Sequence, residues 1–276
     1  MSTTTPRMPV HFLSHGGGPW PWMAEDETGG AYAQLRVALK ALVAELPASP
    51  RAVLLVTAHW EAVDFTLSSA TAPGMIYDYG GFPPHTYQIQ YPAPGAPDLA
   101  EQVQVLLRAG GVQARLDATR GYDHGTFVVM AEMFPNADVP LLQVSLKSGL
   151  DPAAHLEFGR LLAPLREQGV LIIGSGLSYH NLRLFNARAA EPSRAFDDWL
   201  QETVVRSSPA EREKRLLAWA QAPSARVAHP REEHLLPLMV AVGAADGELG
   251  QCPYHEADFF GAISVSNFSF GTGAVE

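Results

Sequence analysis

The stretch RAVLLVT, residues 51–57, decides the fold class of this 276-residue chain. Every residue between Arg51 and Thr57 is apolar, so a β-strand here would present apolar side chains on both faces. Strands of this kind are typical of the centre of a sheet that helices cover on both sides. The stretch therefore predicts a buried central strand of an α/β protein.

Strand-like and helix-like segments alternate around this stretch. Further strands are expected at Val10–Leu13, Leu141–Leu146, Val170–Gly174 and Ala262–Phe270. Helices are expected at Tyr32–Leu46, Pro97–Ala109, Phe127–Phe134, Pro152–Gln168, Arg194–Arg206, Ala210–Gln221 and His234–Val242. The alternation predicts one sheet with helices on both faces, and the length fits a single catalytic domain over residues 1–276.

Charge and composition exclude several kinds of partner. The formal net charge of −10 repels phosphate backbones, and no run of Lys and Arg offsets it, so nucleic acid is not an expected partner. No apolar run approaches the ~20 residues that a membrane-spanning helix needs, and residues 1–9 lack the apolar core of a secretion signal. A single cysteine, Cys252, allows no internal disulfide. We expect a cytoplasmic protein, and the sequence does not indicate its oligomeric state.

Two segments depart from the regular alternation. Ser68–Gly95 is rich in Pro, Gly and Tyr, and a loop of this length in a compact domain is usually a lid or a binding loop. The alternative is an ordered surface excursion. Ser207–His229, with its Pro, Ser and charge clusters, is a weaker candidate for a mobile excursion.

Three of the ten histidines follow predicted strands. His15 comes after the first strand and precedes a glycine turn, His59 ends the central apolar run, and His180 follows the strand of residues 170–174. Ligands collect at the carboxyl ends of strands in α/β sheets, so these imidazoles are expected to converge. Each alone is more often a structural histidine. The string HGGG also occurs in esterases, but their G-x-S-x-G motif is absent.

Two more histidines stand at predicted helix starts. His124 lies between Asp123 and a helix, where an uncharged imidazole is favoured, although Asp123 and Thr126 are also typical helix caps. His234 follows Glu233, which could be a ligand itself, orient an imidazole, or form part of a solvated first turn. Widely spaced histidines without cysteine suit Fe(II), Zn(II), Cu or Mn better than a structural zinc site.

A set of strings in fixed order extends these observations over nearly the whole chain. They are FLSHG (12–16), AHW (58–60), DYGGFP (78–83), YPAPG (91–95), DHG (123–125), HNL (180–182) and EHLLPL (233–238). Together they resemble the class III extradiol ring-cleavage dioxygenases, in particular the 4,5-DOPA dioxygenase branch of the LigB-like superfamily. The resemblance implies a LigB-like, phosphorylase-like α/β domain with a mostly parallel mixed sheet.

The resemblance also implies roles for the site residues. His15, His59 and His234 look like metal ligands, and His180 like the active-site base or a fourth ligand. His124 matches a histidine that faces substrate and oxygen. Related enzymes use two histidines and a glutamate, so the third ligand is either His234, which we favour, or Glu233.

The implied activity is the opening of a catechol-type ring by O₂ on Fe(II), with Zn(II) as a metal that purified protein could carry. The substrate would be a small aromatic diol, which Tyr77, Tyr79 and Phe82 of the long loop could cover, unless these rings only pack within the loop. Two other hypotheses use the same histidines. One is a zinc hydrolase, because Zn(II) activates water but not O₂, and the other is a non-enzymatic binding protein of the Memo type.

Overall fold

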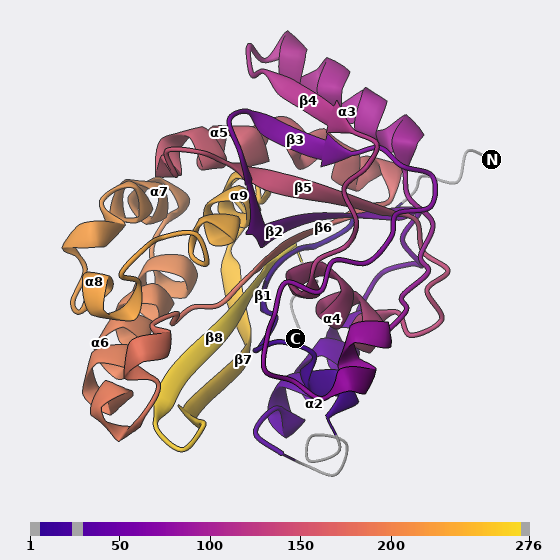
Figure 1. Cartoon of the computed structure of the whole chain (residues 1–276). Coiled ribbons are helices and arrows are strands. Elements are labelled where there is room, and N and C mark those ends of the chain that lie inside the picture. Colours follow the sequence, from indigo (N-terminus) through magenta and orange to yellow (C-terminus); the bar gives the residue numbers. More distant parts are fainter. Residues whose placement is uncertain (1–5, 24–29, 272–276) are drawn as a thin grey trace.

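The computed structural model of the chain describes residues 6–23 and 30–271. Within them, one eight-stranded sheet forms the centre of the molecule, and helices pack on both faces (Figure 1). The strands are β1 (Val10–Ser14), β2 (Ala52–Ala62), β3 (Phe65–Ser68), β4 (Ala114–Asp117), β5 (Leu141–Lys147), β6 (Val170–Gly176), β7 (Gly250–Phe259) and β8 (Ile263–Phe270). The α-helices are α2 (Ala33–Ala44), α3 (Pro97–Ala109), α4 (His124–Met133), α5 (Pro152–Leu162), α6 (Ala190–Gln201), α7 (Pro209–Leu217), α8 (Ala225–Ala228) and α9 (Leu236–Ala244).

The sheet has the order β4-β3-β5-β2-β6-β1-β8-β7. Its four central strands, β5, β2, β6 and β1, are all parallel to their neighbours within this group. Antiparallel pairs join β3 to β5 on one side and β8 to β1 and β7 on the other. The apolar stretch lies in β2, where Val53 to Val56 are fully buried. The predicted α/β class with a mostly parallel mixed sheet is confirmed.

Two neighbouring residues of β6 show how closely helices cover both faces, since successive side chains of a strand point to opposite sides. A Cβ atom at Gly174 would lie 2.2 Å from the carbonyl oxygen of Pro237, at the start of α9. The next residue, Ser175, donates a hydrogen bond to the carbonyl of Gly125 in α4. Helices α9 and α4 therefore cover opposite faces, and each approaches the sheet at the end where the strands finish.

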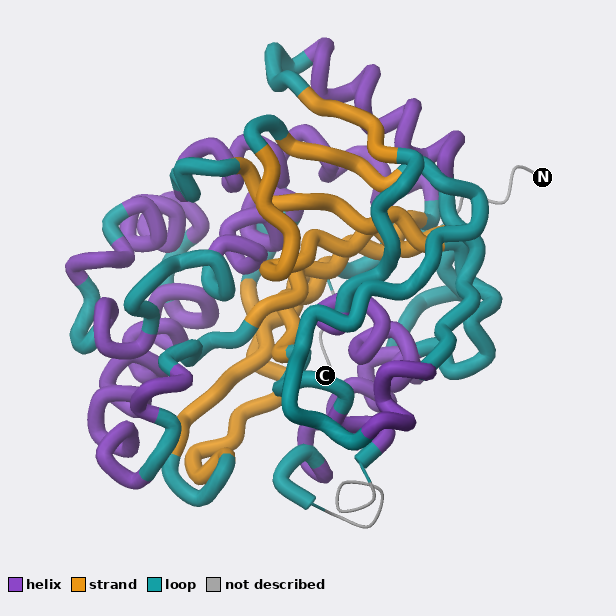
Figure 2. The backbone as a smooth tube through the Cα atoms, in the orientation of Figure 1, coloured by secondary structure: helices purple, strands orange, loops and turns teal. Residues whose placement is uncertain are grey.

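The two irregular segments differ from each other in the structure. The loop between β3 and α3 contains only a short 3₁₀ helix, Pro84–Gln88, and Figure 2 shows it in teal as it passes the start of α4. Residues 207–229 carry two α-helices, α7 and α8, and bury Leu216 and Trp219, so this segment is a packed part of the fold. The described part of the chain contains no helix long and apolar enough to cross a membrane.

Candidate metal centre and substrate cavity

The central parallel strands bring three histidines to one edge of the sheet. His15 directly follows β1, and His180 follows β6 after a short turn. His59 lies inside β2, which continues to Ala62 and does not end at His59 as the sequence predicted. The pairing of β2 with β6 nevertheless stops at Thr57, so His59 lies where the regular ladder ends.

The other two histidines come from chain segments that enter helices. His124 is the first residue of α4, and the side chain of Asp123 accepts a hydrogen bond from the Thr126 amide, which is the capping arrangement considered above. His234 lies two residues before α9, so this helix begins later than predicted. The carbonyl of His234 accepts a hydrogen bond from the amide of Leu177, which ties it to the end of β6.

The imidazoles of His15, His59 and His234 meet at their Nε2 atoms. Nε2 of His59 is 3.2 Å from Nε2 of His15 and also 3.2 Å from Nε2 of His234. Two nitrogens bound to one ion at about 2.1 Å would be about 3.0 to 3.4 Å apart for right-angled to tetrahedral geometry. Both measured pairs therefore have the spacing of ligands that share a metal ion. Ligand atoms also lie within 4.8 Å of one another in two parts of the cluster, His15 with His59 and His124, and His234 with His180 and Glu233.

Carboxylates on the far sides of two of these rings determine which nitrogen carries the proton. Nδ1 of His59 lies 3.3 Å from Asp78, and Nδ1 of His234 is hydrogen-bonded to Glu233 at 3.1 Å. An ionised carboxylate only accepts hydrogen bonds, so Nδ1 is the donor and each Nε2 presents a lone pair. Two lone pairs facing each other repel unless a cation lies between them. This donor set therefore fits a divalent metal.

Each carboxylate also holds a second imidazole. Asp78 accepts hydrogen bonds from the backbone amide and from Nδ1 of His124, at 3.0 and 2.8 Å. Glu233 lies 3.4 Å from Nδ1 of His180, whose ring is stacked on that of His234 with 3.4 Å between the centroids. The five predicted histidines thus form one cluster, organised around two acidic residues.

Electrostatics keep the imidazoles of His15, His59 and His234 neutral and the carboxylates of Asp78 and Glu233 ionised. Burial, with a further contribution from neighbouring imidazoles, holds the pKa values of His15 and His59 well below 6.5, and burial lowers the pKa of His234 to about 4. Burial alone would raise the pKa values of Asp78 and Glu233, but their hydrogen bonds to histidines outweigh it and lower both. Neutral imidazoles beside ionised carboxylates are the forms that bind a cation.

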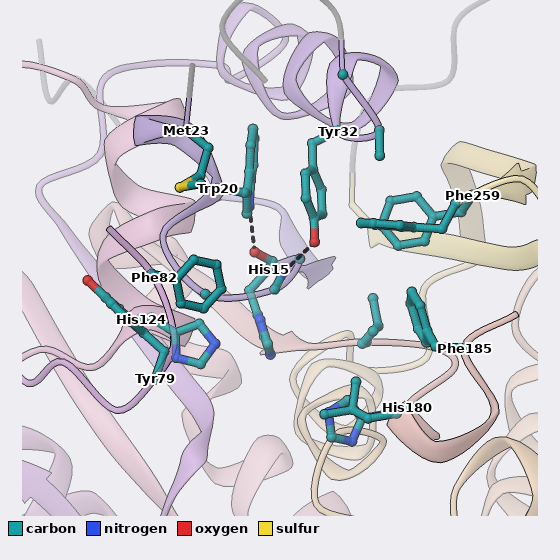
Figure 3. A pocket seen from close by; sticks show the side chains of 18 of the residues that line it. His15, Trp20, Met23, Tyr32, Tyr79, Phe82, His124, His180, Phe185 and Phe259 are labelled. Atoms are coloured by element: carbon teal, nitrogen blue, oxygen red, sulfur yellow. Dashed lines mark hydrogen bonds between the residues drawn. The ribbon is translucent and has the colours of Figure 1, made fainter. Parts of the chain in front are cut away.

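A cavity of about 750 Å³ opens over the histidines. His15, His59, His124 and His180 are among its lining residues, and seven of the other sixteen are aromatic (Figure 3). These aromatic residues are Trp20, Tyr32, Tyr79, Phe82, Phe185, Phe259 and Phe260. A cavity of this size and composition is typical of a binding site for a small organic molecule.

The predicted substrate-covering residues of the long loop divide into two groups. Tyr79 and Phe82 line the cavity, with the hydroxyl of Tyr79 donating to the carbonyl of Thr86. Tyr77 is not among the lining residues, because its hydroxyl is turned to the carbonyl of Ile89 within the loop. For Tyr77 the structure therefore favours local packing over substrate contact.

Two parts of the site had no local signal in the sequence. Asp78 lies in a quoted string, but only the fold shows that this loop carboxylate joins His59 to His124. The far wall of the cavity comes from Phe185 and from the turn of Phe259 and Phe260 between β7 and β8. Phe259 and Phe260 are distant in sequence from the five histidines, whereas Phe185 follows His180 by five residues.

Fold and cluster together define an α/β enzyme with a site for one metal ion at the carboxyl ends of parallel strands. Comparison with known proteins identifies the family. The model of the catalytic LigB subunit of aromatic ring-opening dioxygenase matches residues 9–268, and the chain belongs to this family. It is a metal-dependent enzyme that cleaves catechol rings with O₂, as the sequence strings predicted.

Individual relatives match over most of their length. A dioxygenase of Hapsidospora irregularis is 35% identical, with 100% of this chain and 89% of the relative covered. The 4,5-DOPA dioxygenase extradiol of Portulaca grandiflora is 40% identical, with 84% of each covered. Among solved structures, an uncharacterized protein of Escherichia coli K12 has a TM-score of 0.78 at 30% identity, covering 96% of this chain and 100% of its own.

Proposed function

We propose that the protein is an extradiol dioxygenase that binds Fe(II) through His15, His59 and His234 and opens the ring of a dihydroxyphenyl substrate. The observation that supports this most directly is the meeting of three Nε2 atoms beside an aromatic cavity. Fe(II) supplies the redox chemistry that O₂ requires and that Zn(II) lacks. The family match also favours ring opening over a zinc hydrolase or a Memo-type binding protein.

His180 is the proposed base. With Nδ1 turned to Glu233, the ring of a neutral His180 has its lone pair on Nε2, and His180 lines the cavity where the diol would lie. It would accept the proton of the second phenolic hydroxyl. Glu233 would balance the charge that the ring then carries, so the same carboxylate would orient both the base and the ligand His234.

His124 contacts Asp78 through Nδ1, just as His180 contacts Glu233. Its Nδ1 is bonded to Asp78, so a neutral ring presents an accepting Nε2 and not a donor to the cavity. His124 would donate a hydrogen bond to oxygen only after it has taken up a proton, whose charge Asp78 would balance. The aromatic walls would exclude water and so strengthen these interactions.

The assignment of ligands and base is tested by comparing two variants. After anaerobic reconstitution with Fe(II), His15→Ala should lose the metal, whereas His180→Ala should retain it and lose about a hundredfold or more in turnover. Metal content is measured by elemental analysis, and turnover by O₂ uptake with DOPA and simple catechols. Equal metal loss in both variants would make His180 a ligand.

The identity of the metal needs a separate comparison. The same preparation loaded with Zn(II) should bind catechols but consume no O₂. If the Zn(II) protein were as active as the Fe(II) protein, or if the Fe(II) protein consumed no O₂ with any catechol, the proposed function would be wrong.

A further inference from the structure

The cavity has a chemical character that the ring-opening reaction does not require. None of the described residues that line the cavity is Lys or Arg. Among the described lining residues the single carboxylate is Asp78, which is already paired with His59 and His124. A substrate carboxylate that lay inside the cavity, against its aromatic walls, would therefore face no lysine or arginine of the described lining, which is unfavourable.

The volume exceeds what a bare catechol ring needs. About 750 Å³ lies within the range of roughly 300 to 1,000 Å³ that encloses much larger organic ligands. In Figure 3 the rings of His124 and His180 lie on one side of this space, Trp20, Met23 and Tyr32 lie on the other, and His15 lies between them. A diol held at the histidines would leave room for a sizeable substituent against these apolar side chains.

The mouth of the cavity is apolar as well. Leu182 and Phe260 both line it and are 70% and 48% exposed, which is unusual for large apolar side chains. Phe260 has a left-handed backbone with φ of 51°, a conformation that a bulky residue adopts only at a cost in free energy. Its ring contacts Tyr32 and Phe185, with centroids 5.3 and 5.4 Å away. Phe260 and Gly261, with φ of 51° and 77°, lie in the turn between β7 and β8, where tight hairpins use left-handed backbone.

We propose that this enzyme acts on catechols whose ring carries a bulky, uncharged, apolar substituent, and that it discriminates against catechols with a carboxylate on that substituent. This inference rests on the proposed function. The ring with its two hydroxyls would lie at the histidines, and the substituent would extend along Trp20 and Tyr32 towards Phe260 and Leu182. Burial of apolar surface would strengthen binding of the substituent. The absence of lysine and arginine from the described lining would disfavour a carboxylate.

The test compares two ligands that differ mainly in charge, 3-(3,4-dihydroxyphenyl)propionate and its methyl ester. Binding to the Fe(II) protein is measured without O₂ by isothermal titration calorimetry, and turnover is then measured by O₂ uptake. The ester should bind at least about tenfold more tightly and have the higher kcat/KM. Equal or tighter binding of the acid would overturn this inference and leave the proposed function standing. If neither ligand bound and no catechol led to O₂ uptake, both would be wrong.

Two matched variants locate the effect. Leu182→Arg places a cation at the mouth on an exposed residue and should tighten binding of the acid by about threefold or more. Val105→Arg adds the same charge to exposed Val105 of α3, outside the lining, and should not change it. Equal tightening in both variants would point to the overall charge of the protein and contradict the local argument.

The strained residue provides a second check. Phe260→Asn removes the apolar wall, while asparagine tolerates the left-handed backbone, so the protein should remain folded. The Kd of the methyl ester should rise several-fold more than the Kd of unsubstituted catechol. If both Kd values rose equally, the substituent would not reach Phe260, and the proposed orientation would be wrong.

Discussion

Asp78 and Glu233 have equivalent roles in the histidine cluster, because each carboxylate orients two imidazoles. Each carboxylate faces Nδ1 of a proposed ligand and Nδ1 of a proposed catalytic histidine. The proton on Nδ1 leaves the lone pair on Nε2, directed at the metal or the substrate. Neither residue needs to touch the ion to control how strongly it is held.

Replacing Asp78 is expected to weaken metal binding. Asp78→Asn keeps the size of the side chain but removes the negative charge that faces two imidazoles, and should raise the Kd for Fe(II) or Zn(II) about 10- to 100-fold. Competition with a chromophoric chelator measures this Kd. Asp64→Asn is the matched control, since Asp64 is paired with Arg115 outside the cluster. Equal Kd values for the two variants would contradict the role of Asp78.

Measuring the Kd for the metal in two further variants also decides whether Glu233 or His234 is the third ligand. With His234 as the ligand, His234→Ala should abolish binding of the metal, whereas Glu233→Gln should weaken it by a factor similar to Asp78→Asn. The glutamine can still accept a hydrogen bond from Nδ1 of His234. Complete loss of metal in Glu233→Gln together with retention in His234→Ala would make the glutamate the ligand.

The predictability of the site differs between its residues for a physical reason. His15, His59 and His180 follow apolar runs, so the sequence already indicates that they lie at one edge of a sheet. Asp78 lies in a long loop, and nothing in its neighbours shows where that loop passes. Its partnership with His59 and His124 depends on the path of the whole chain.

At the scale of elements, the glycine turn after β1 illustrates how loops shape the cavity. Gly18 has φ of 55°, and a Cβ atom there would lie 2.5 Å from the ring of Phe82. The turn is free of side chains, as the sequence suggested, and aromatic rings of the protein itself occupy the adjacent space. Trp20 donates a hydrogen bond to the carbonyl of His15 and closes the turn (Figure 3).

Gly18→Ala should therefore affect both stability and substrate binding. The left-handed backbone should cost about 1 kcal/mol in the free energy of unfolding, and the displaced Phe82 should raise KM for catechols. Gly111→Ala is the control, because Gly111 has φ of 77° with no atom near the position of a Cβ. It should show the loss of stability in urea unfolding without the change in KM. Equal KM values in both variants would show that Phe82 is not displaced or does not contact substrate.

The strands also show which elements a sequence can reveal. β1, β2, β5, β6 and β8 are buried over most of their length, and all five were expected. β3 and β4 have only four residues each, too few for a clear pattern, and β4 is partly exposed. β7 mixes polar and apolar residues around Pro253 without regular alternation, and it lies at the edge of the sheet. These three strands are defined by their neighbours more than by their own residues.

At the scale of the whole molecule, histidines outside the site link folding to pH. His11 is fully buried in β1, with Nδ1 2.7 Å from the hydroxyl oxygen of Ser269 on β8. Burial, and to a lesser extent the charge of Arg166, lowers the pKa of His11 to about 3 from 6.5. Below pH 6.5 the unfolded chain takes up a proton here that the folded chain does not. The contribution of neutral His11 to the free energy of unfolding is therefore complete above pH 6.5 and is lost as the pH falls.

His11→Gln should accordingly make the metal-free protein less sensitive to acid. Between about pH 6 and about pH 4, the free energy of unfolding of the unmodified protein should fall more steeply than that of the variant, by about 1.4 kcal/mol per pH unit. Urea unfolding at several pH values measures both slopes, and the slopes are compared because the variant can be less stable at every pH. Parallel slopes would contradict the assignment.

The two edges of the sheet have a consequence for self-association. An unpaired edge strand can recruit a strand from another molecule and so start aggregation. Here β4 is only four residues long, and β7 contains Pro253, which has no N–H to donate, within a ladder whose register shifts twice. Both edges are poor templates for a further strand. The continuous apolar strands that carry the histidines remain enclosed between them, where they cannot pair with another chain.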